Sequence, residues 1–394
     1  MEPQQGAILT GQQIGAGWTP ALSVVKALTA LAEARSQGLR AVYWMADEDH
    51  DRHEVASSCA LHGQRLVPHR FRFEAPAGTA TGWLPWTGAH QAEAESLWGP
   101  LPAPGTPDLR GHALALGHPL WELGIEPYSP TLAPSRPAIQ SELERWRALD
   151  LERELVRQAD RLEAEGAPLP LDPRTQAAWF SLDPRSGLRR RLEKSQPCPA
   201  GCWLSPGAAL RPLMQSLLLL VAGVVLGPAE RAYWRLAEPL WERVGLQAPR
   251  IIPRPSVYLV PPGLQLDAGT LEALREGRWE AFQGDPLALP SKALASVVPD
   301  PAWGGPLGDR FTKELERTRQ RLAKLDRRLL RDAAARRFGC DPEHLRQRLF
   351  PFGRPQERVL PGVHWLRDPE LLQRILEGIE RGESLILVEN GHGS

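Results

Sequence analysis

The sequence has few cysteines, no excess of either charge and no long apolar run, and each of these features excludes a class of protein. Lys and Arg together number 47, and so do Asp and Glu, so no overall field favours nucleic acid or an anionic membrane as a partner. The longest apolar run, Leu217 to Leu226, is too short to cross a bilayer. The N-terminus lacks the pattern of a signal peptide, and the four cysteines are scattered, as is typical of reduced thiols. We therefore expect a cytoplasmic protein with small-molecule substrates, and neither nucleic acid nor a membrane as a partner.

The stretch from Ala7 to Val55 has the pattern of a strand–helix–strand unit. Ala7-Ile8-Leu9 and Ala41 to Ala46 are short apolar runs, which are typical of buried parallel strands. Between them, Thr19-Pro20 indicates a helix start with Thr as the N-cap, and apolar residues at helical spacing continue to about Ala34. Polar residues follow the second strand, at the edge where open α/β sheets bind ligands.

The same alternation returns after residue 200. A short strand over 202–204 leads into a helix that we expect to start at Ser205-Pro206, and Val221 to Leu226 is a third buried strand. Gly227 to Glu230 then forms a turn into a helix over 231–244. Residues 250–260 form a last strand, at an edge or a bulge because it contains two prolines. Two strand–turn–helix units in one chain predict two half-sites that face one crevice.

Regular alternation stops between these halves and again after residue 300, which predicts the domain organisation. We expect a core of residues 1–60 and 200–300, an inserted connecting region over 61–199 and a segment over 351–394 that returns to the core. Within the insertion we expect a helix over 111–123, a loop over 127–137 and a long helix over 138–164. The stretch 78–107, rich in Gly, Pro and Trp, has no clear period and is mostly loop.

Residues 301–350 have a different pattern. Leu315, Leu322 and Leu329 are spaced by seven within a charged sequence, which predicts a coiled-coil-like helix from about Gly308 to Arg337. A shorter capped helix follows, and the chain ends with a helix over 369–381 and an apolar strand over 385–388. The long helix could pack on the core surface or form a homodimer through its apolar seam, and the pattern leaves both open.

A glycine-containing loop from Thr10 to Gly17 opens onto the first helix. Free backbone N–H groups and the helix dipole would bind a phosphate or carboxylate there. The loop has neither the G-x-G-x-x-G nor the Walker A pattern, so an ordinary turn between strand and helix is the alternative. Lys26, two turns into the helix, would either reach an anion or lie in solvent.

Asp47-Glu48-Asp49-His50-Asp51 is the strongest local signal. Four carboxylates beside one imidazole repel each other unless a cation or a cationic substrate amine is present. His50 could act as a general base oriented by a neighbouring acid. With His53 and Glu54, the cluster could instead bind a divalent metal. We rank polar-substrate binding with acid–base chemistry first, a metal second and a solvated acidic loop third, and we assign no metal ligand.

At the second half-site, Glu230 would lie in the first turn of a helix. As a helix cap it needs no further function, whereas in the crevice it could bind an ammonium group. Cys198 and Cys202 have no second ligand pair nearby, so zinc is not expected.

Together, these stretches resemble the BshC family, the bacillithiol-forming cysteine ligases. The matching residues span nearly the whole chain in the family's order: Thr10-Gly11-Gln12-Gln13, Pro20, Lys26, Glu48-Asp49-His50-Asp51, Glu54, Ser205-Pro206, Arg211-Pro212, Gln215, Gly227-Pro228, Glu230, Tyr233-Trp234, Pro249, Arg254, Pro351, Gly353 and Gln356-Glu357-Arg358. The resemblance implies an α/β fold with a Rossmann-like parallel-sheet core, similar to class I nucleotidyl-transferases, and a coiled-coil arm used for dimerisation. The chain departs from the family in being short, with a reduced arm.

The resemblance also implies a reaction, the last step in the synthesis of the low-molecular-weight thiol bacillithiol. The carboxyl of cysteine is joined to the amine of glucosaminyl-malate. Because a free carboxylate does not react with an amine, the carboxyl must be activated, and Mg-ATP is the expected activator by analogy with the fold.

This hypothesis gives the candidate residues their roles. Asp49, His50 and Asp51 would bind the substrate amine and remove its proton, so they are the catalytic candidates. The binding candidates, for phosphate or malate oxygens and for the other side of the crevice, are Thr10, Gly11, Gln12, Gln13, Lys26, Glu48, Gly227, Glu230, Tyr233 and Arg254. Two other classes stay open: a metal-dependent hydrolase that uses the acidic cluster, and a non-catalytic nucleotide- or thiol-binding homologue.

Overall fold

The computed structural model of the protein describes residues 6–62, 65–132, 134–194, 196–282, 289–298, 300, 302 and 304–389. The chain forms two compact units, one of Met1–Val257 with Glu357–Val388 and one of Tyr258–Gln356 with Glu389–Ser394. Among the residues described, no helix is long and apolar enough to span a bilayer.

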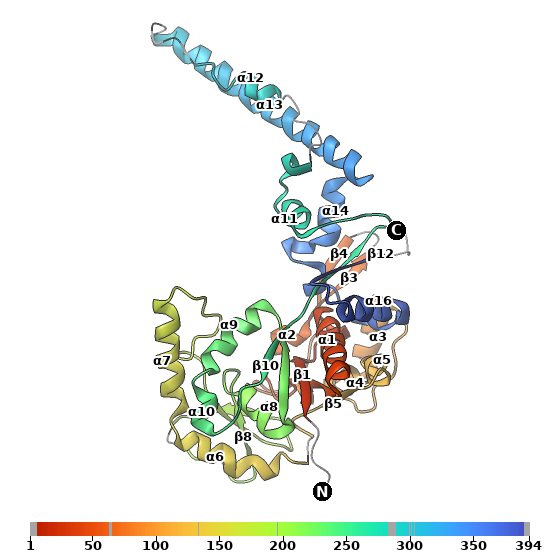
Figure 1. The fold of residues 1–394 in the computed structure, drawn as a ribbon, viewed down its shortest axis with the longest axis vertical. Coiled ribbons are helices and arrows are strands. Elements are labelled where there is room, and N and C mark those ends of the chain that lie inside the picture. The colour runs from red at the N-terminus through yellow and green to blue at the C-terminus, as the bar shows by residue number, and fades with distance from the viewer. Residues whose placement is uncertain are drawn as a thin grey trace. The chain divides into compact units, whose positions relative to one another are not determined.

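The first unit is built on a five-stranded parallel sheet (Figure 1). Its order is β10-β9-β1-β2-β5, and the bounds are β1 (Ala7–Gln12), β2 (Arg40–Met45), β5 (Ile125–Tyr128), β9 (Val221–Leu226) and β10 (Arg250–Pro253). When the five strands are numbered in chain order and read from β5, the sheet order is 3-2-1-4-5, as in Rossmann-like sheets. The topological switch point lies between β1 and β9. The expected Rossmann-like parallel sheet is therefore confirmed.

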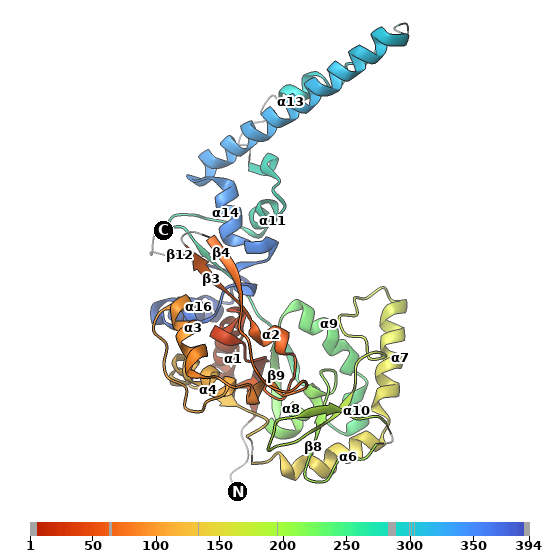
Figure 2. The ribbon, with the colours of Figure 1, turned by 180° about the vertical axis from the view of Figure 1, so that it is seen from behind.

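Helices cover the sheet because its central strands are apolar on both faces. Helix α1 (Leu22–Gln37) packs on β1, β2 and β9. Ala7, Leu9, Val42 and Trp44 belong to one apolar core with residues of five further helices. These are α6 (Gln140–Ala148), α7 (Leu151–Ala164), α8 (Arg211–Leu219), α9 (Pro228–Ala237) and α10 (Leu240–Val244), of which α7 packs on α9 and α10 (Figure 2).

Smaller elements complete the first unit. Two small antiparallel sheets are formed by β3 (Ser57–His62) with β4 (Arg65–Arg70), and by β7 (Arg189–Arg191), β6 (Trp179–Leu182) and β8 (Trp203–Pro206). The remaining helices are α2 (Arg52–Ala56), α3 (Gly88–Trp98), α4 (Leu109–Leu116), α5 (His118–Glu122), α15 (Val363–Leu366) and α16 (Pro369–Glu380). β11 (Ser256–Val260) and β12 (Leu385–Glu389) pair with each other.

The second unit is mainly helical. It contains α11 (Ala268–Glu276), α12 (Pro290–Ala293), α13 (Gly305–Phe338) and α14 (Pro342–Leu349). Helix α13 confirms the long helix expected over 308–337, and Leu315 and Leu330 are buried in it. Part of its apolar seam is therefore already covered within its own unit, where α12 packs on it.

Three predicted helices are each interrupted. The helix expected over 138–164 is divided into α6 and α7, because Asp150 between them has a left-handed backbone with φ 54°. The helix expected over 231–244 begins at Pro228 and is divided into α9 and α10 by Pro239, which cannot donate a helical hydrogen bond. The helix expected over 111–123 is α4 and α5, with Pro119 in the first turn of α5.

Two of the strand predictions also differ from the structure. β5 lies partly in the loop expected over 127–137 and within the stretch expected to lie outside the sheet. The sequence did not predict this strand because Glu126 and Pro127 interrupt the apolar run that would have indicated it. Residues 250–260 form two strands that separate at Arg254 and Pro255. The domain boundaries themselves stay a prediction.

Two helix starts lie further along the chain than expected. Helix α1 starts at Leu22 with Ala21 as its N-cap, and the Thr19 hydroxyl donates to the Ala16 carbonyl instead of capping the helix. Ser205 and Pro206 end β8, and helix α8 starts at Arg211.

Candidate functional site

A polar cavity of about 270 Å³ lies at the switch point, where the carboxyl ends of β1 and β9 diverge. Both predicted half-sites contribute to it, as the two strand–turn–helix units suggested. Its polar lining residues are Thr10, Gly11, Gln12, Gln13, Lys26, Asp49, Glu54, Arg211, Gln215, Glu230 and Tyr233, and its apolar ones include Trp44, Pro212, Leu226 and Trp234.

The end of β1 places two glutamine side chains in the cavity wall. Gln12 donates to Glu54 Oε1 at 3.3 Å, and Gln13 donates to Asp49 Oδ2 at 3.1 Å. The Oε1 atom of Gln13 is buried and has no hydrogen-bond partner among the described residues. Gly11 allows the strand to lie close to β2, since a Cβ atom there would be 2.7 Å from the Trp44 carbonyl oxygen. The close approach of β1 to β2 at Gly11 therefore places the side chains of Gln12 and Gln13 in the cavity wall.

Lys26 is neither solvated nor free to bind an anion. Its ammonium donates to Glu230 Oε1 at 2.6 Å and to the Gly11 carbonyl at 2.5 Å, and the side chain is 1% exposed. The other oxygen of Glu230 accepts the Gly227 N–H at 2.7 Å, which caps α9. This pair joins the two halves of the site, and neither of the predicted alternatives for Lys26 describes it.

The N-terminus of α1 does not face the cavity. The Ala21 N–H donates to the Leu360 carbonyl at 2.8 Å, and the residues of the first turn are not among those that line the cavity. Residues 10–12 belong to β1 itself, so the predicted anion-binding loop is not a loop at that point.

The acidic cluster separates into individual pairs. Asp47 accepts from Ser129 at 2.5 Å and Thr131 at 2.7 Å, and burial raises its pKa to about 6. Glu48 accepts from Arg136 at 2.9 Å, with both side chains fully buried, and Asp51 caps α2.

Because these carboxylates point to different partners, they do not converge on a common centre. Among the residues described, no group of three or more His, Cys, Asp or Glu side chains could hold a metal ion. The geometry therefore gives no support to the metal-site alternative.

Asp49 is the residue of the cluster that lines the cavity. Its Oδ2 accepts from Arg211 at 3.0 Å, and Arg189 lies 3.4 Å from Oδ1. Burial alone would raise the pKa of Asp49, but the charges of Arg211 and Arg189 lower it well below its usual range. Asp49 therefore stays ionised at neutral pH and is a weak proton acceptor.

His50 lies beside this group but is not among the residues that line the cavity. Arg189 Nη1 is 3.0 Å from its Nδ1, and because a guanidinium can only donate, Nδ1 is the acceptor. In the neutral ring the proton is then on Nε2. Burial and the charge of Arg189 lower the pKa of His50, which favours this neutral form. The geometry makes His50 a hydrogen-bond donor at Nε2, and its role as a base stays a prediction.

The remaining predicted residues occupy different positions. Tyr233 lines the cavity, and burial raises its pKa. Arg254 pairs with Glu357 Oε1 at 2.7 Å and is 3% exposed, outside the cavity lining. Glu48 and Gly227 also lie outside the lining, so Glu48, His50, Asp51, Gly227 and Arg254 support or surround the cavity without forming its wall.

Sequence reasoning gave no site role to three arginines that determine the charge of this site, although Arg211 was among the residues that match the family. Arg211 opens α8 and lines the cavity, whereas Arg136 and Arg189 come from distant segments and are buried behind it. Arg211 had a usable signal, because it follows a short strand at the start of a helix in the second half-site. Arg189 had none, since its run of three arginines is typical of a solvated surface.

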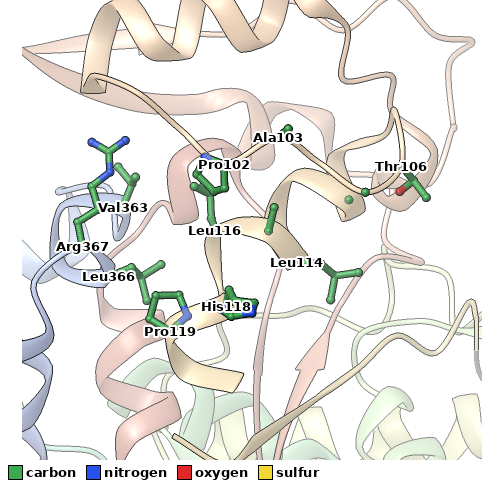
Figure 3. Close-up of a pocket in the computed structure, with 13 residues that line it drawn as sticks. Pro102, Ala103, Thr106, Leu114, Leu116, His118, Pro119, Val363, Leu366 and Arg367 are labelled. Atoms are coloured by element: carbon green, nitrogen blue, oxygen red, sulfur yellow. The ribbon is translucent and has the colours of Figure 1, made fainter. Parts of the chain in front are cut away.

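A second cavity, of about 620 Å³, lies elsewhere in the first unit (Figure 3). Its wall is largely apolar, with Leu114, Leu116, Pro119, Val363 and Leu366 from α4, α5 and α15. The guanidinium of Arg367 at its rim already donates to the carbonyls of Trp98, Gly99 and Pro100.

Comparisons with known proteins agree with the fold and with the motifs that line the switch-point cavity. The profile of the family described as "Bacillithiol biosynthesis BshC, N-terminal Rossmann-like domain" matches residues 188–255. The protein named "Putative cysteine ligase BshC" from one strain of Thermus thermophilus is 30% identical over 428 residues, covering 94% of this chain and 86% of the relative. The protein of the same name from Solibacter usitatus is 25% identical and covers 96% of this chain and 83% of the relative. The chain belongs to the BshC family.

Proposed function

We propose that the protein is a ligase that joins the carboxyl of L-cysteine to the amine of glucosaminyl-malate, the last step of bacillithiol biosynthesis. One observation carries the proposal: motifs that match the family and lie far apart in the chain meet at one polar cavity at the switch point. The ligase name borne by relatives that cover 94% of the chain supports the reaction class.

Amide-bond formation requires the site to hold the reacting groups in a fixed geometry. The C–N bond forms when the substrate amine, having lost a proton to solvent, attacks an activated cysteine carboxyl; the bond to the activating group breaks, and the nitrogen releases a second proton to solvent. In this proposal the substrate amine lies beside Asp49 and His50, and His50 donates a hydrogen bond from Nε2. We keep Asp51 only as the cap that fixes the orientation of this segment.

ATP would supply the activation, but the residues that line the switch-point cavity do not fit a triphosphate. The charged side chains of the cavity wall are two cations, Lys26 and Arg211, and three carboxylates, and Lys26 is already paired with Glu230, so the charges of a triphosphate would be left uncompensated. The N–H groups of Ala21 and Gly227, at the two helix starts beside β1 and β9, already donate to protein acceptors. We therefore assign no residue of this cavity to ATP, and no step is derived through it.

A homodimer through α13 is part of the same proposal. Leu322 and Leu329 are partly exposed on this helix, while Leu315 is buried within its own unit, so the apolar seam left for a partner is short. Light scattering on the purified protein would distinguish a dimer from a monomer, and catalysis in the proposal does not depend on the outcome.

The test is to incubate the purified protein with L-cysteine, glucosaminyl-malate and Mg-ATP and to look for the coupled thiol by mass spectrometry. We expect a product that disappears when ATP is left out. A product that forms without ATP would keep the ligase and overturn the activation. No product from folded protein would contradict the proposal and favour a non-catalytic binding homologue, whereas chelator-sensitive hydrolysis would favour the metal enzyme.

A further inference from the structure

The buried charges behind the switch-point cavity are not balanced. Arg136, Arg189 and Arg211 face the carboxylates of Glu48 and Asp49, at 2.9 Å for Arg136 with Glu48 and 3.0 Å for Arg211 with Asp49. Within the described part of the chain, each of these three guanidinium groups lies near a carboxylate, but three positive charges against two negative ones leave a surplus of one positive charge. A surplus of buried charge is costly, so this arrangement favours an anion next to Arg211.

Arg211 is also the guanidinium of this group that reaches the cavity, since Arg136 is fully buried. Its Nη2 donates to Asp49, while its Nε lies 3.6 Å from Glu48 Oε1 and makes no hydrogen bond to a described residue. The Nε atom is buried toward Glu48, but no described residue accepts a hydrogen bond from Nη1, so this part of the guanidinium is left for a carboxylate ligand.

Another part of the same cavity wall favours a positively charged ligand group. Glu54 lines the cavity and accepts a hydrogen bond from Gln12 at 3.3 Å, and the buried Oε1 of Gln13 has no partner among the described residues. A carboxylate and an orphaned carbonyl-type oxygen are both acceptors. Together they suit a ligand with several N–H donors, as an ammonium group has.

The whole polar wall then carries no net charge. The negative charge of Glu54 balances the surplus behind Arg211, and Lys26 and Glu230 form a neutral pair. A dianionic malate group or a polyphosphate would be left uncompensated in this site. A volume of about 270 Å³ also lies below the range typical of pockets for drug-sized ligands, so a small molecule fits better.

We propose that the switch-point cavity selects a small zwitterionic amino acid, with Arg211 binding its α-carboxylate and Glu54, assisted by Gln13, binding its α-ammonium. The apolar wall of Trp44 and Trp234 would contact a short apolar or thiol side chain. The inference rests on the proposed function in taking that amino acid to be L-cysteine. Arg211 and Glu54 are specificity-determining residues in it; from the sequence, Arg211 had no assigned role and Glu54 only that of a possible metal ligand.

The test uses ligands that each lack one charged group. Isothermal titration calorimetry on the full-length protein would measure the affinity of L-cysteine, of cysteamine, which lacks the carboxylate, and of 3-mercaptopropionate, which lacks the ammonium. Because a hydrogen bond to a charged group contributes enough for about a ten- to hundredfold change in Kd, we expect both analogues to bind at least about tenfold more weakly than L-cysteine.

Two variants then separate the two contacts. Arg211→Gln should weaken L-cysteine and 3-mercaptopropionate about tenfold or more, while leaving cysteamine unchanged. Glu54→Gln, which keeps an acceptor for Gln12, should weaken L-cysteine and cysteamine while leaving 3-mercaptopropionate unchanged. Arg231→Gln and Glu238→Gln, on exposed side chains of the same region, serve as matched controls and should change none of the three affinities.

A crossed pattern of this kind cannot arise from a general loss of folding, which would weaken every ligand alike. Equal losses for all three ligands in either variant, or no binding of L-cysteine to the folded wild type, would overturn the inference. Binding that follows the expected pattern without formation of the coupled product would leave the inference intact and count only against the proposed ligase reaction.

Discussion

The two cavities of the first unit differ in volume and in the polarity of their walls, and the smaller one is the more polar. The larger, about 620 Å³, has a largely apolar wall, and the guanidinium at its rim donates to three backbone carbonyls. The smaller, about 270 Å³, is lined by charged groups from both halves of the sheet and retains a buried oxygen that no described residue satisfies. Polar groups that the fold brings together but does not satisfy are better evidence of a ligand site than volume is.

The largest expected effect tests whether buried charges hold the smaller cavity in shape. Arg136→Ala would leave the fully buried Glu48 without its guanidinium, and we expect it to lower the free energy of unfolding by about 3–5 kcal/mol. Urea denaturation measures this. The double variant Arg136→Met with Glu48→Gln, which removes both charges at similar volume, should recover most of the loss. A loss of less than about 1 kcal/mol in the single variant would contradict the prediction.

A second effect is a pH dependence of stability that comes from Asp47, in the segment after β2 that also supplies Asp49 to the smaller cavity. Asp47 has a pKa of about 6 in the folded protein because it is buried, against about 3.9 in an unfolded chain. Between these values the unfolded state binds fewer protons than the folded state, so stability falls as the pH rises from about 4 to 6 and levels off above that.

Asp47→Asn should remove this dependence while keeping an acceptor for Ser129 and Thr131. The stability of the wild type minus that of the variant should fall by at most about 3 kcal/mol between about pH 4 and 7. Urea denaturation at several pH values measures it, and all other titrating groups cancel in the difference. A difference that rises with pH would show that the Asp47 pKa is lowered by its partners and not raised by burial.

The third effect concerns the backbone that carries the glutamines into the smaller cavity. Gly11→Ala would place a Cβ atom 2.7 Å from the Trp44 carbonyl oxygen and 2.8 Å from its Cβ atom, so β1 and β2 must separate. We expect a loss of about 1–3 kcal/mol in stability together with weaker binding of L-cysteine. Gly88→Ala in the first turn of α3, where nothing lies within 4 Å, is the control and should be nearly neutral. Equal behaviour of the two variants would contradict the tight approach.

Local sequence predicted the frame of the smaller cavity but not its charges. Short apolar runs such as Val221 to Leu226 indicate buried parallel strands, and the polar residues after β1, β2 and β9 indicate the edge at which a ligand binds. The directions of Asp47 and Glu48 could not be predicted, because their partners Ser129 and Arg136 lie more than 80 residues away, whereas Asp51 caps α2 through the neighbouring His53 and Glu54. A carboxylate cluster in sequence became separate pairs in space for that reason.

The smallest expected effect tests the difference between the two cavities most directly. Leu114 lies partly exposed in the wall of the larger cavity, so Leu114→Ser removes apolar surface there without leaving a buried polar group. We expect a change of less than about 1 kcal/mol in stability and no change in the affinity for L-cysteine or in product formation. Calorimetry beside the Arg211→Gln variant gives the contrast. If Leu114→Ser weakened L-cysteine as much as Arg211→Gln does, the apolar cavity would be part of the binding site, and unsatisfied polar groups would not distinguish the two.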